Sequence, residues 1–338
     1  MKYELRFWAE VMEPREIVES AFPLLKEFKA GVAVAVYPVS LTKKNANAFR
    51  KLLDAGIELT YWPLMEKEQG YFPGERNVDE YAAMVRHLVE WAEKNEVAPG
   101  RIAVDLEPPI QQLSSVLAAR GRVALLRGAV SAARENLDRG RYYRAKAILD
   151  ELNYWVRERG IKTLAAVMPW VALELEGEYE LIQDMSDTPA AGIDWDMLSP
   201  MLYVTMLAGM QGANLNTRDA NWLIYDSCLK LRAKYGERAG VSLGLTGTGI
   251  LDNEPVFQSP GELLVGLQAA LAAGVRDVSI YSLEGIMNRA EPREWFAAIR
   301  DAEPRLPERS EKIARSLSAV RYVYPTIARV VDWYRRPP

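Results

Sequence analysis

Short apolar segments alternate with helical patterns along most of the chain, and this alternation restricts the fold more than any other feature. Strands joined through helices form a parallel sheet, because each connection has to return to the starting end of the sheet. Eight strands with interleaved helices favour an α/β fold that is a single closed (β/α)8 TIM barrel, and a doubly wound open sheet is the alternative. The eight segments with strand patterns are Lys2–Ala9, Gly31–Tyr37, Ile57–Leu64, Arg101–Glu107, Lys162–Trp170, Met197–Thr205, Val241–Thr248 and Val278–Leu283. The helical patterns between and after them are Pro14–Lys29, Lys43–Ala55, Asp79–Asn95, Gln111–Arg159, Asn221–Tyr235, Gly261–Ala273 and Pro292–Ala302.

One barrel and two additions account for the length of the chain. The barrel domain is predicted to span 1–303, and the connection 109–160 within it is long enough for a two-helix insertion after the fourth strand. Residues 304–338 have the pattern of an extra C-terminal helix that packs on the barrel. The alternative for its Tyr334–Arg336 end is contact with a partner or a membrane surface. The acidic connection Glu174–Asp196 has little room for a full helix.

Composition disfavours several classes of function. The net charge of −4 argues against nucleic acid as a partner, because phosphate binding needs a basic surface. The single histidine, His87, lies in a helical pattern, which disfavours a Ser-His-Asp triad and a histidine-rich metal site. No apolar run approaches the roughly 20 residues of a membrane span. We predict no cofactor, no metal and no integral membrane segment, and the sequence leaves the oligomeric state open.

The N-terminus has a charged strand pattern and no signal peptide. With one cysteine, Cys228, no disulfide can form within the chain, which fits a reducing compartment. We therefore expect a cytoplasmic protein, or an extracellular one if a leader has been removed.

Alternation along the strands predicts which side chains face the barrel interior. In the fourth strand the apolar residues pack on the helices, so Asp105 and Glu107 face inward at its C-terminal end. At the opposite end of the barrel, Glu4, Arg6 and Glu58 also face inward. Because buried charges have to be paired, we predict a salt-bridge network at that end.

Asp105 and Glu107 lie where (β/α)8 barrels carry their active sites, at the C-terminal end of a strand. Residues two apart on a strand point the same way, and two carboxylates this close cannot both ionise freely. One pKa should therefore rise, which makes a general acid available near neutral pH. The alternative is a purely structural pair bound by arginines or backbone amides.

Six aromatic residues are predicted to converge on the same rim. Their flat faces suit the apolar faces of sugar rings, and their polar tips supply hydrogen bonds, so we predict an oligosaccharide or glycan as the ligand. They are Trp8, Tyr37, Trp62, Trp170, Tyr203 and Tyr281.

Polar residues of the strand ends and loops complete the predicted substrate site. Met201 faces inward from the sixth strand, and Glu10 and Glu284 lie just past the first and eighth strands. Thr246 opens the turn Thr246–Gly249, which we interpret as a tight turn approaching the substrate; a phosphate cradle is the alternative. Each of these acids is also an ordinary candidate for a solvated loop residue.

Three short motifs resemble family 18 glycoside hydrolases, the chitinase-like barrels. Arg101–Glu107 resembles the strand-four signature that ends in Asp-x-Glu. Pro200–Tyr203 resembles the strand-six Met-x-Tyr-Asp, and Gly274–Glu284 resembles the last strand, where Tyr281 stands in place of a substrate-floor tryptophan. The resemblance covers the barrel as a whole.

The resemblance implies a retaining, substrate-assisted hydrolysis of an N-acetylhexosamine-containing glycan. Glu107 would protonate the glycosidic oxygen as the general acid/base, and the N-acetyl oxygen of the substrate would attack the anomeric carbon. Asp105 would orient the acetamido group, and Tyr203 would hydrogen-bond it. The family's other acids are absent, since Ala103 precedes Asp105 by two and Val204 follows Tyr203.

These departures leave two further hypotheses. A catalytically inactive chitinase-like carbohydrate-binding protein fits the missing acids but not the retained Glu107. A metal-dependent barrel would use Asp105, Glu107 and Glu284, and the absence of histidines near the site disfavours it.

Overall fold

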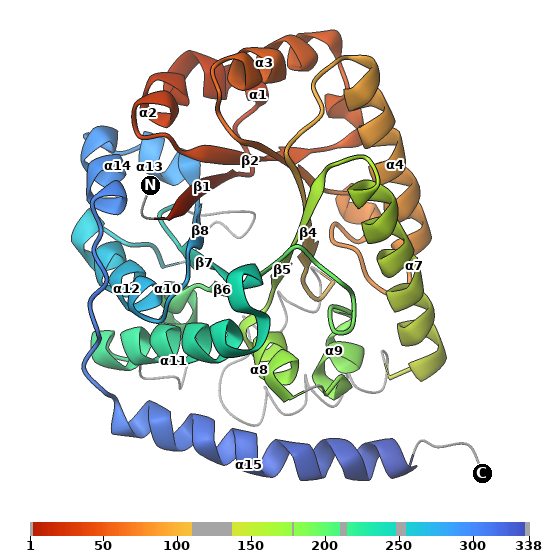
Figure 1. The fold of residues 1–338 in the computed structure, drawn as a ribbon, viewed down its shortest axis with the longest axis vertical. Helices are drawn as coiled ribbons and strands as arrows, with labels where there is room; N and C mark the ends of the chain where they lie inside the picture. Colours follow the sequence, from red (N-terminus) through yellow and green to blue (C-terminus); the bar gives the residue numbers. More distant parts are fainter. Residues whose placement is uncertain (1–2, 110–136, 178, 210–214, 248–254, 335–338) are drawn as a thin grey trace.

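Eight parallel strands close into a barrel in the order in which they occur in the chain (Figure 1). The computed structural model describes residues 3–109, 137–177, 179–209, 215–247 and 255–334. The barrel closes where β1 pairs with β8, with Trp8 beside Tyr281. The predicted fold class, a single (β/α)8 barrel, is confirmed. The strands are β1 (Glu4–Ala9), β2 (Gly31–Val36), β3 (Leu59–Pro63), β4 (Arg101–Leu106), β5 (Lys162–Val167), β6 (Met197–Leu202), β7 (Gly240–Gly244) and β8 (Asp277–Tyr281).

Helices surround the barrel and bury the outward-facing side chains of the strands (Figure 1). Many are amphipathic, and α3 buries Ala46, Phe49 and Leu52 at the three- and four-residue spacing of one helix face. The helices are α1 (Pro14–Glu16), a π-helical turn (Ile17–Ala21), α2 (Phe22–Glu27), α3 (Lys43–Asp54), α4 (Val78–Lys94), α7 (Arg139–Arg157), α8 (Pro169–Gly177), α9 (Leu181–Ser186), α10 (Val204–Gly209), α11 (Thr217–Tyr235), α12 (Pro260–Ala272), α13 (Leu283–Met287), α14 (Pro292–Arg300) and α15 (Glu311–Tyr334). Short 3-10 turns lie at Pro38–Ser40, Lys67–Gln69 and Gly236–Arg238.

Several predicted boundaries were wrong, and the seventh strand, for example, ends at Gly244 and not at Thr248. The fifth strand ends at Val167 and not at Trp170, because Pro169 has no N–H for the sheet and begins α8. The sixth strand ends at Leu202, and α10 begins two residues later. The connection Glu174–Asp196, in which we expected little room for a full helix, holds the end of α8 and the six-residue α9.

The two predicted additions are described in part. Residues 110–136 of the insertion after β4 lie outside the described residues, and α7 follows them. The C-terminal helix α15 packs mainly on α11. In the part of the chain that the structure describes, no helix is long and apolar enough to cross a membrane.

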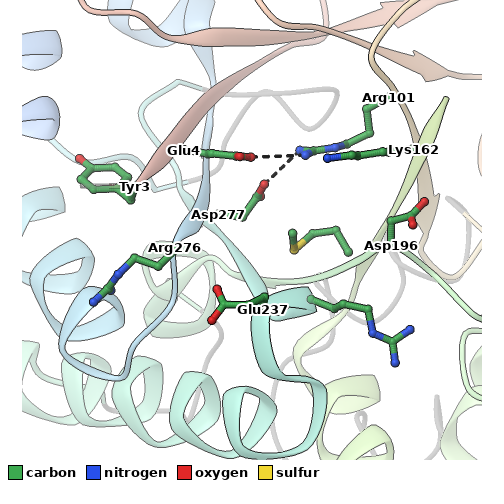
Figure 2. A pocket seen from close by; sticks show the side chains of 10 residues that line it. Tyr3, Glu4, Arg101, Lys162, Asp196, Glu237, Arg276 and Asp277 are labelled. Atoms are coloured by element: carbon green, nitrogen blue, oxygen red, sulfur yellow. Dashed lines mark hydrogen bonds and ion pairs between the residues drawn. The ribbon is translucent and has the colours of Figure 1, made fainter. Parts of the chain in front are cut away.

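A network of ion pairs lies at the N-terminal end of the barrel, and Figure 2 shows the part in which Arg101 contacts Glu4 and Asp277. The buried carboxylate of Asp277 lies 3.1 Å from a guanidinium nitrogen of Arg6 and 3.0 Å from one of Arg101. Glu58 lies 3.4 Å from Arg6, and Glu4 lies 3.4 Å from Arg101. The predicted network of Glu4, Arg6 and Glu58 is therefore confirmed, and Asp277 and Arg101 are its buried centre. Glu4, Arg101 and Asp277 form part of the wall of a hollow of about 720 Å³ at this end.

Candidate active site

Asp105 is buried at the C-terminal end of β4 and faces the barrel interior. Its Oδ1 has no hydrogen-bond partner among the described residues, and neither has the indole nitrogen of the neighbouring Trp62. Burial raises the pKa of Asp105 well above its usual range, and the nearby Glu10 carboxylate raises it further. A carboxyl that keeps its proton in this way can donate a hydrogen bond near neutral pH.

Glu107 follows β4 directly and is partly exposed at the mouth of the barrel. The chain then continues through Pro108 and Pro109, neither of which can donate a backbone hydrogen bond to a sheet. The strand therefore ends where the barrel opens, with Asp105 below the mouth and Glu107 beside it. This difference in depth gives the two carboxyls different surroundings, as the separate roles of an acid and an assisting group require.

Glu10 lies just past β1, buried, and its carboxylate accepts hydrogen bonds from two tyrosines. The hydroxyl of Tyr71 donates to one oxygen over 2.7 Å, and the hydroxyl of Tyr281 donates to the other. Because the proton of Tyr71 is directed to Glu10, the 2.9 Å contact between Tyr37 and Tyr71 requires Tyr37 to be the donor. These phenols hold a carboxylate at the mouth through neutral donors.

Tyr71 was not predicted from the sequence. It lies in the loop between β3 and α4, outside any strand or helix, with a φ of 68°. Burial raises its pKa, and Glu10 raises it further, so the phenol stays protonated and able to donate. Alternation along a strand cannot identify a residue in such a loop.

The aromatic side chains form two pairs inside the mouth. Trp8 and Trp62 meet edge to face with ring centroids 4.9 Å apart, and the indole of Trp8 donates to Ser242 over 3.1 Å. Tyr203 and Tyr281 are tilted by 35° with centroids 5.6 Å apart. The sequence placed all four at strand ends facing inward, and the structure brings them together beneath the mouth.

Trp170 does not belong to this group. Because Pro169 ends the strand, Trp170 lies in α8, where it is partly exposed and packs against the hydrophobic core. The prediction that it faces inward from a strand end is wrong.

The remaining predicted residues divide by their contacts. Met201 is buried within β6. Thr246 is fully buried, and its hydroxyl donates to the carbonyl of Ser282 and accepts from the N–H of the same residue. It thereby joins the ends of β7 and β8. Gly247 packs so closely on Gly285 that a Cβ would come within 2.5 Å of its Cα, as a tight turn requires.

Glu284 ties α13 to the end of β1. Its Oε1 accepts the backbone N–H of Glu10 over 2.9 Å and that of Val11 over 3.2 Å. Burial raises its pKa against these hydrogen bonds, which lower it. Its Oε1 is therefore occupied with the backbone, whereas its buried Oε2 has no hydrogen-bond partner among the described residues. Within the described ranges no group of three or more His, Cys, Asp or Glu is arranged to hold a metal ion.

A hollow of about 330 Å³ opens beside Glu10 at the mouth. The segments that form this hollow follow β1, β2 and β3 in the chain, and Figure 1 shows these three strands in the ring of the barrel. Although it is smaller than the hollow at the N-terminal end, it lies at the end of the barrel where sites form. Its wall consists of Glu10, Val11, Tyr37, Met65, Glu66, Lys67, Glu68 and Tyr71.

No protein-family model and no curated protein sequence matches the chain. Solved structures do match it. A chitinase from Rhizomucor miehei aligns with a TM-score of 0.50 and 13% identity, over 89% of this chain and all of its own length. The two chains share a (β/α)8 barrel fold.

Two other matching structures agree. A glycoside hydrolase domain from Bordetella bronchiseptica aligns with a TM-score of 0.50 and 9% identity, over 91% of this chain and 100% of that domain. The spore cortex-lytic enzyme of Bacillus megaterium QM B1551 aligns with a TM-score of 0.51 and 10% identity, over 91% of this chain and 75% of its own. At such identities these likenesses show a glycoside hydrolase-like fold and do not show the reaction.

Proposed function

We propose that this chain is a glycoside hydrolase that cleaves an N-acetylhexosamine-containing glycan by a retaining, substrate-assisted mechanism. The proposal rests mainly on the burial and the unsatisfied hydrogen bonding of Asp105. It is a buried carboxyl beneath the mouth with a raised pKa and an oxygen without a hydrogen-bond partner among the described residues, two positions before Glu107. A substrate group such as an acetamide N–H or carbonyl would satisfy that oxygen or accept its proton.

The proposed chemistry uses one enzyme acid and one substrate nucleophile. Glu107 donates its proton to the glycosidic oxygen, and the bond from that oxygen to the anomeric carbon breaks. The acetamido oxygen of the substrate attacks the anomeric carbon as Asp105 orients the acetamido group, and Tyr203 hydrogen-bonds it. Water then attacks the same carbon while Glu107 takes up a proton, which restores the enzyme and retains the anomeric configuration.

Glu10 supplies a charge that the sequence motifs lack. The family pattern has acids where this chain has Ala103 and Val204, and both of these residues are buried. Glu10 lies close enough to Asp105 to raise its pKa, although it comes from β1 and not from β4 or β6. We propose that Glu10 and its tyrosine donors perform the electrostatic task of the absent acids.

The same absence favours a second candidate, an inactive carbohydrate-binding protein. Val204 begins α10 directly after Tyr203, so no carboxylate stands beside that phenol from its own strand. A mouth lined by tyrosine and tryptophan binds sugars without turnover equally well.

Release of chromophore from aryl N-acetylhexosaminides and cleavage of N-acetyl-chitooligosaccharides test the proposal. Wild type is compared with Glu107→Gln and Asp105→Asn, each of which keeps the side-chain shape. Turnover by wild type that falls by about 10²–10⁴-fold in Glu107→Gln supports an acid catalyst.

The outcomes separate the two candidates. Saturable glycan binding by wild type without turnover, unchanged in Glu107→Gln, establishes the binding protein and rejects the hydrolase. Turnover that survives both substitutions places the chemistry on other residues. Retention is checked by the anomeric configuration of the first product, since an inverted product excludes assistance by the acetamido group.

A further inference from the structure

The C-terminal helix α15 lies outside the ring of helices that covers the barrel, and runs across its flank (Figure 1). One face is fixed to the barrel by apolar and polar contacts. Ile313, Leu317 and Ala328 are buried. Arg321 pairs with Glu176 over 2.8 Å and with Asp226 over 2.5 Å, and the hydroxyl of Tyr324 donates to the buried Glu174. The helix is therefore held in one orientation.

A second apolar surface of α15 faces solvent. It consists of Val320, Val323, Ile327 and Val330, with 43–50% of each residue exposed, and we call it the outer stripe. Val320 also borders a hollow of about 540 Å³ between α15, α8 and α11. The spacing of three, four and three residues places all four on one side of a helix, next to the buried face. Isolated exposed aliphatic residues are ordinary, but a contiguous row of them along a fixed helix indicates a binding surface.

Charge on α15 is opposite to that of the whole protein. The helix contains four cations and two acids, whereas the chain has a net charge of −4. Lys312 pairs with Asp219 of α11, and Arg321 is paired as described above. Arg315 and Arg329 are exposed on the solvent-facing side of the helix and make no ion pair with the described residues. A partner that fits this surface is apolar in its interior and negatively charged at its boundary.

We propose that the outer stripe docks on an anionic lipid bilayer. The four aliphatic side chains would enter the boundary between headgroups and acyl chains, and Arg315 and Arg329 would contact lipid phosphates. A second copy of α15 is a poorer occupant, because a symmetric pair would bring the same cations of both copies close together. The anchoring face stays on the barrel, so docking needs no rearrangement of the fold.

The position of α15 determines how the barrel would be oriented on a bilayer. In Figure 1 the view passes down the barrel while α15 runs across the picture beside it. A bilayer that contacts the outer stripe therefore lies along the flank of the barrel and leaves both ends of the barrel open. The proposal does not depend on the reaction at the mouth.

Co-sedimentation with vesicles tests the proposal, using the full chain. Phosphatidylcholine vesicles are compared with phosphatidylcholine vesicles that contain phosphatidylglycerol. We expect binding to the anionic vesicles that weakens with added salt, and binding to neutral vesicles that is weaker by about tenfold or more. Val323→Asp/Val330→Asp and, separately, Arg315→Glu/Arg329→Glu should each reduce the affinity by about tenfold or more.

The matched control is Val39→Asp/Val265→Asp, which makes the same change at two exposed valines elsewhere on the protein. It should bind vesicles as wild type does. Absence of wild-type binding to anionic vesicles overturns the proposal, and so does wild-type binding by Val323→Asp/Val330→Asp. Analytical ultracentrifugation identifies the competing case: a dimer that the same substitution dissociates, without vesicle binding, assigns the stripe to self-association and also overturns the proposal.

Discussion

The hydroxyl of Tyr281 donates a hydrogen bond to the carboxylate of Glu10, and so links the last strand to the loop after the first at the mouth of the barrel. The other oxygen of Glu10 accepts from Tyr71. Since the seam between β1 and β8 closes the barrel, this contact couples the position of a site carboxylate to the closure of the fold.

Tyr281→Phe removes that donor and keeps the ring that packs on Tyr203. We expect the free energy of unfolding to fall by about 1.5–3 kcal/mol, as for a hydrogen bond to a charged group. Denaturant unfolding measures it, and Tyr322→Phe is the control, because that phenol is exposed on α15. Equal stabilities for the two variants would show that the hydrogen bond contributes nothing.

Glu10→Gln tests the electrostatic coupling in the site. Removal of the Glu10 charge should lower the pKa of Asp105, but not to its usual value, because burial is the larger cause of the rise. Carbon-13 NMR titration of the carboxyl groups measures the change, with Asp105→Asn to assign the signal. A midpoint that is the same in wild type and Glu10→Gln would contradict the assigned role of Glu10.

Asp277→Asn should strongly destabilise the fold. The substitution leaves the buried guanidinium groups of Arg6 and Arg101 without their shared carboxylate, which costs about 3–5 kcal/mol for a broken buried pair. Glu237→Gln is the control, because Glu237 is an exposed acid on the rim of the same hollow, where an ion pair contributes about 1 kcal/mol or less. Unfolding free energies that differ by less than the measurement error would show that the network is not structural.

The strand order and the inward-facing residues were predictable because both follow from local patterns. Alternation in β4 placed Asp105 inside the barrel, and in β1 it placed Arg6 and Trp8 there. Because a buried guanidinium needs a negative partner, Arg6 was expected to be paired. Its buried partner is Asp277, which precedes the predicted eighth strand by one residue and is the first residue of β8.

The wrong predictions concern the residue at which a strand ends, and the missed site residue lies in a loop that supplies a hydrogen-bond partner to Glu10. Pro169 is a signal in the sequence that β5 ends before Trp170, because proline cannot donate to the sheet. Tyr71 had no such signal, because its position depends on how the loop after β3 folds back over Glu10. Contacts between loops depend on tertiary packing, which residue patterns do not encode.

Two buried carboxyls in the loops beside the barrel should make stability depend on pH. Burial raises the pKa of Glu75 from 4.5 to about 8 and that of Asp187 from 3.8 to about 6. Arg141, 3.1 Å from Glu75, opposes the rise. The folded chain therefore binds protons more tightly than the unfolded chain, and the stabilisation is complete below the unfolded pKa values.

As pH rises from about 4 to about 8, the unfolded chain loses these protons first, so this contribution to the free energy of unfolding should fall and then level off. Glu75→Gln cannot ionise and should make the melting temperature depend less on pH across that window. Glu90→Gln on the exposed face of α4 is the control and should keep the wild-type dependence. If the melting temperatures of wild type and Glu75→Gln change with pH in the same way, Glu75 does not change its protonation on unfolding. Packing alone would then hold the loop in place.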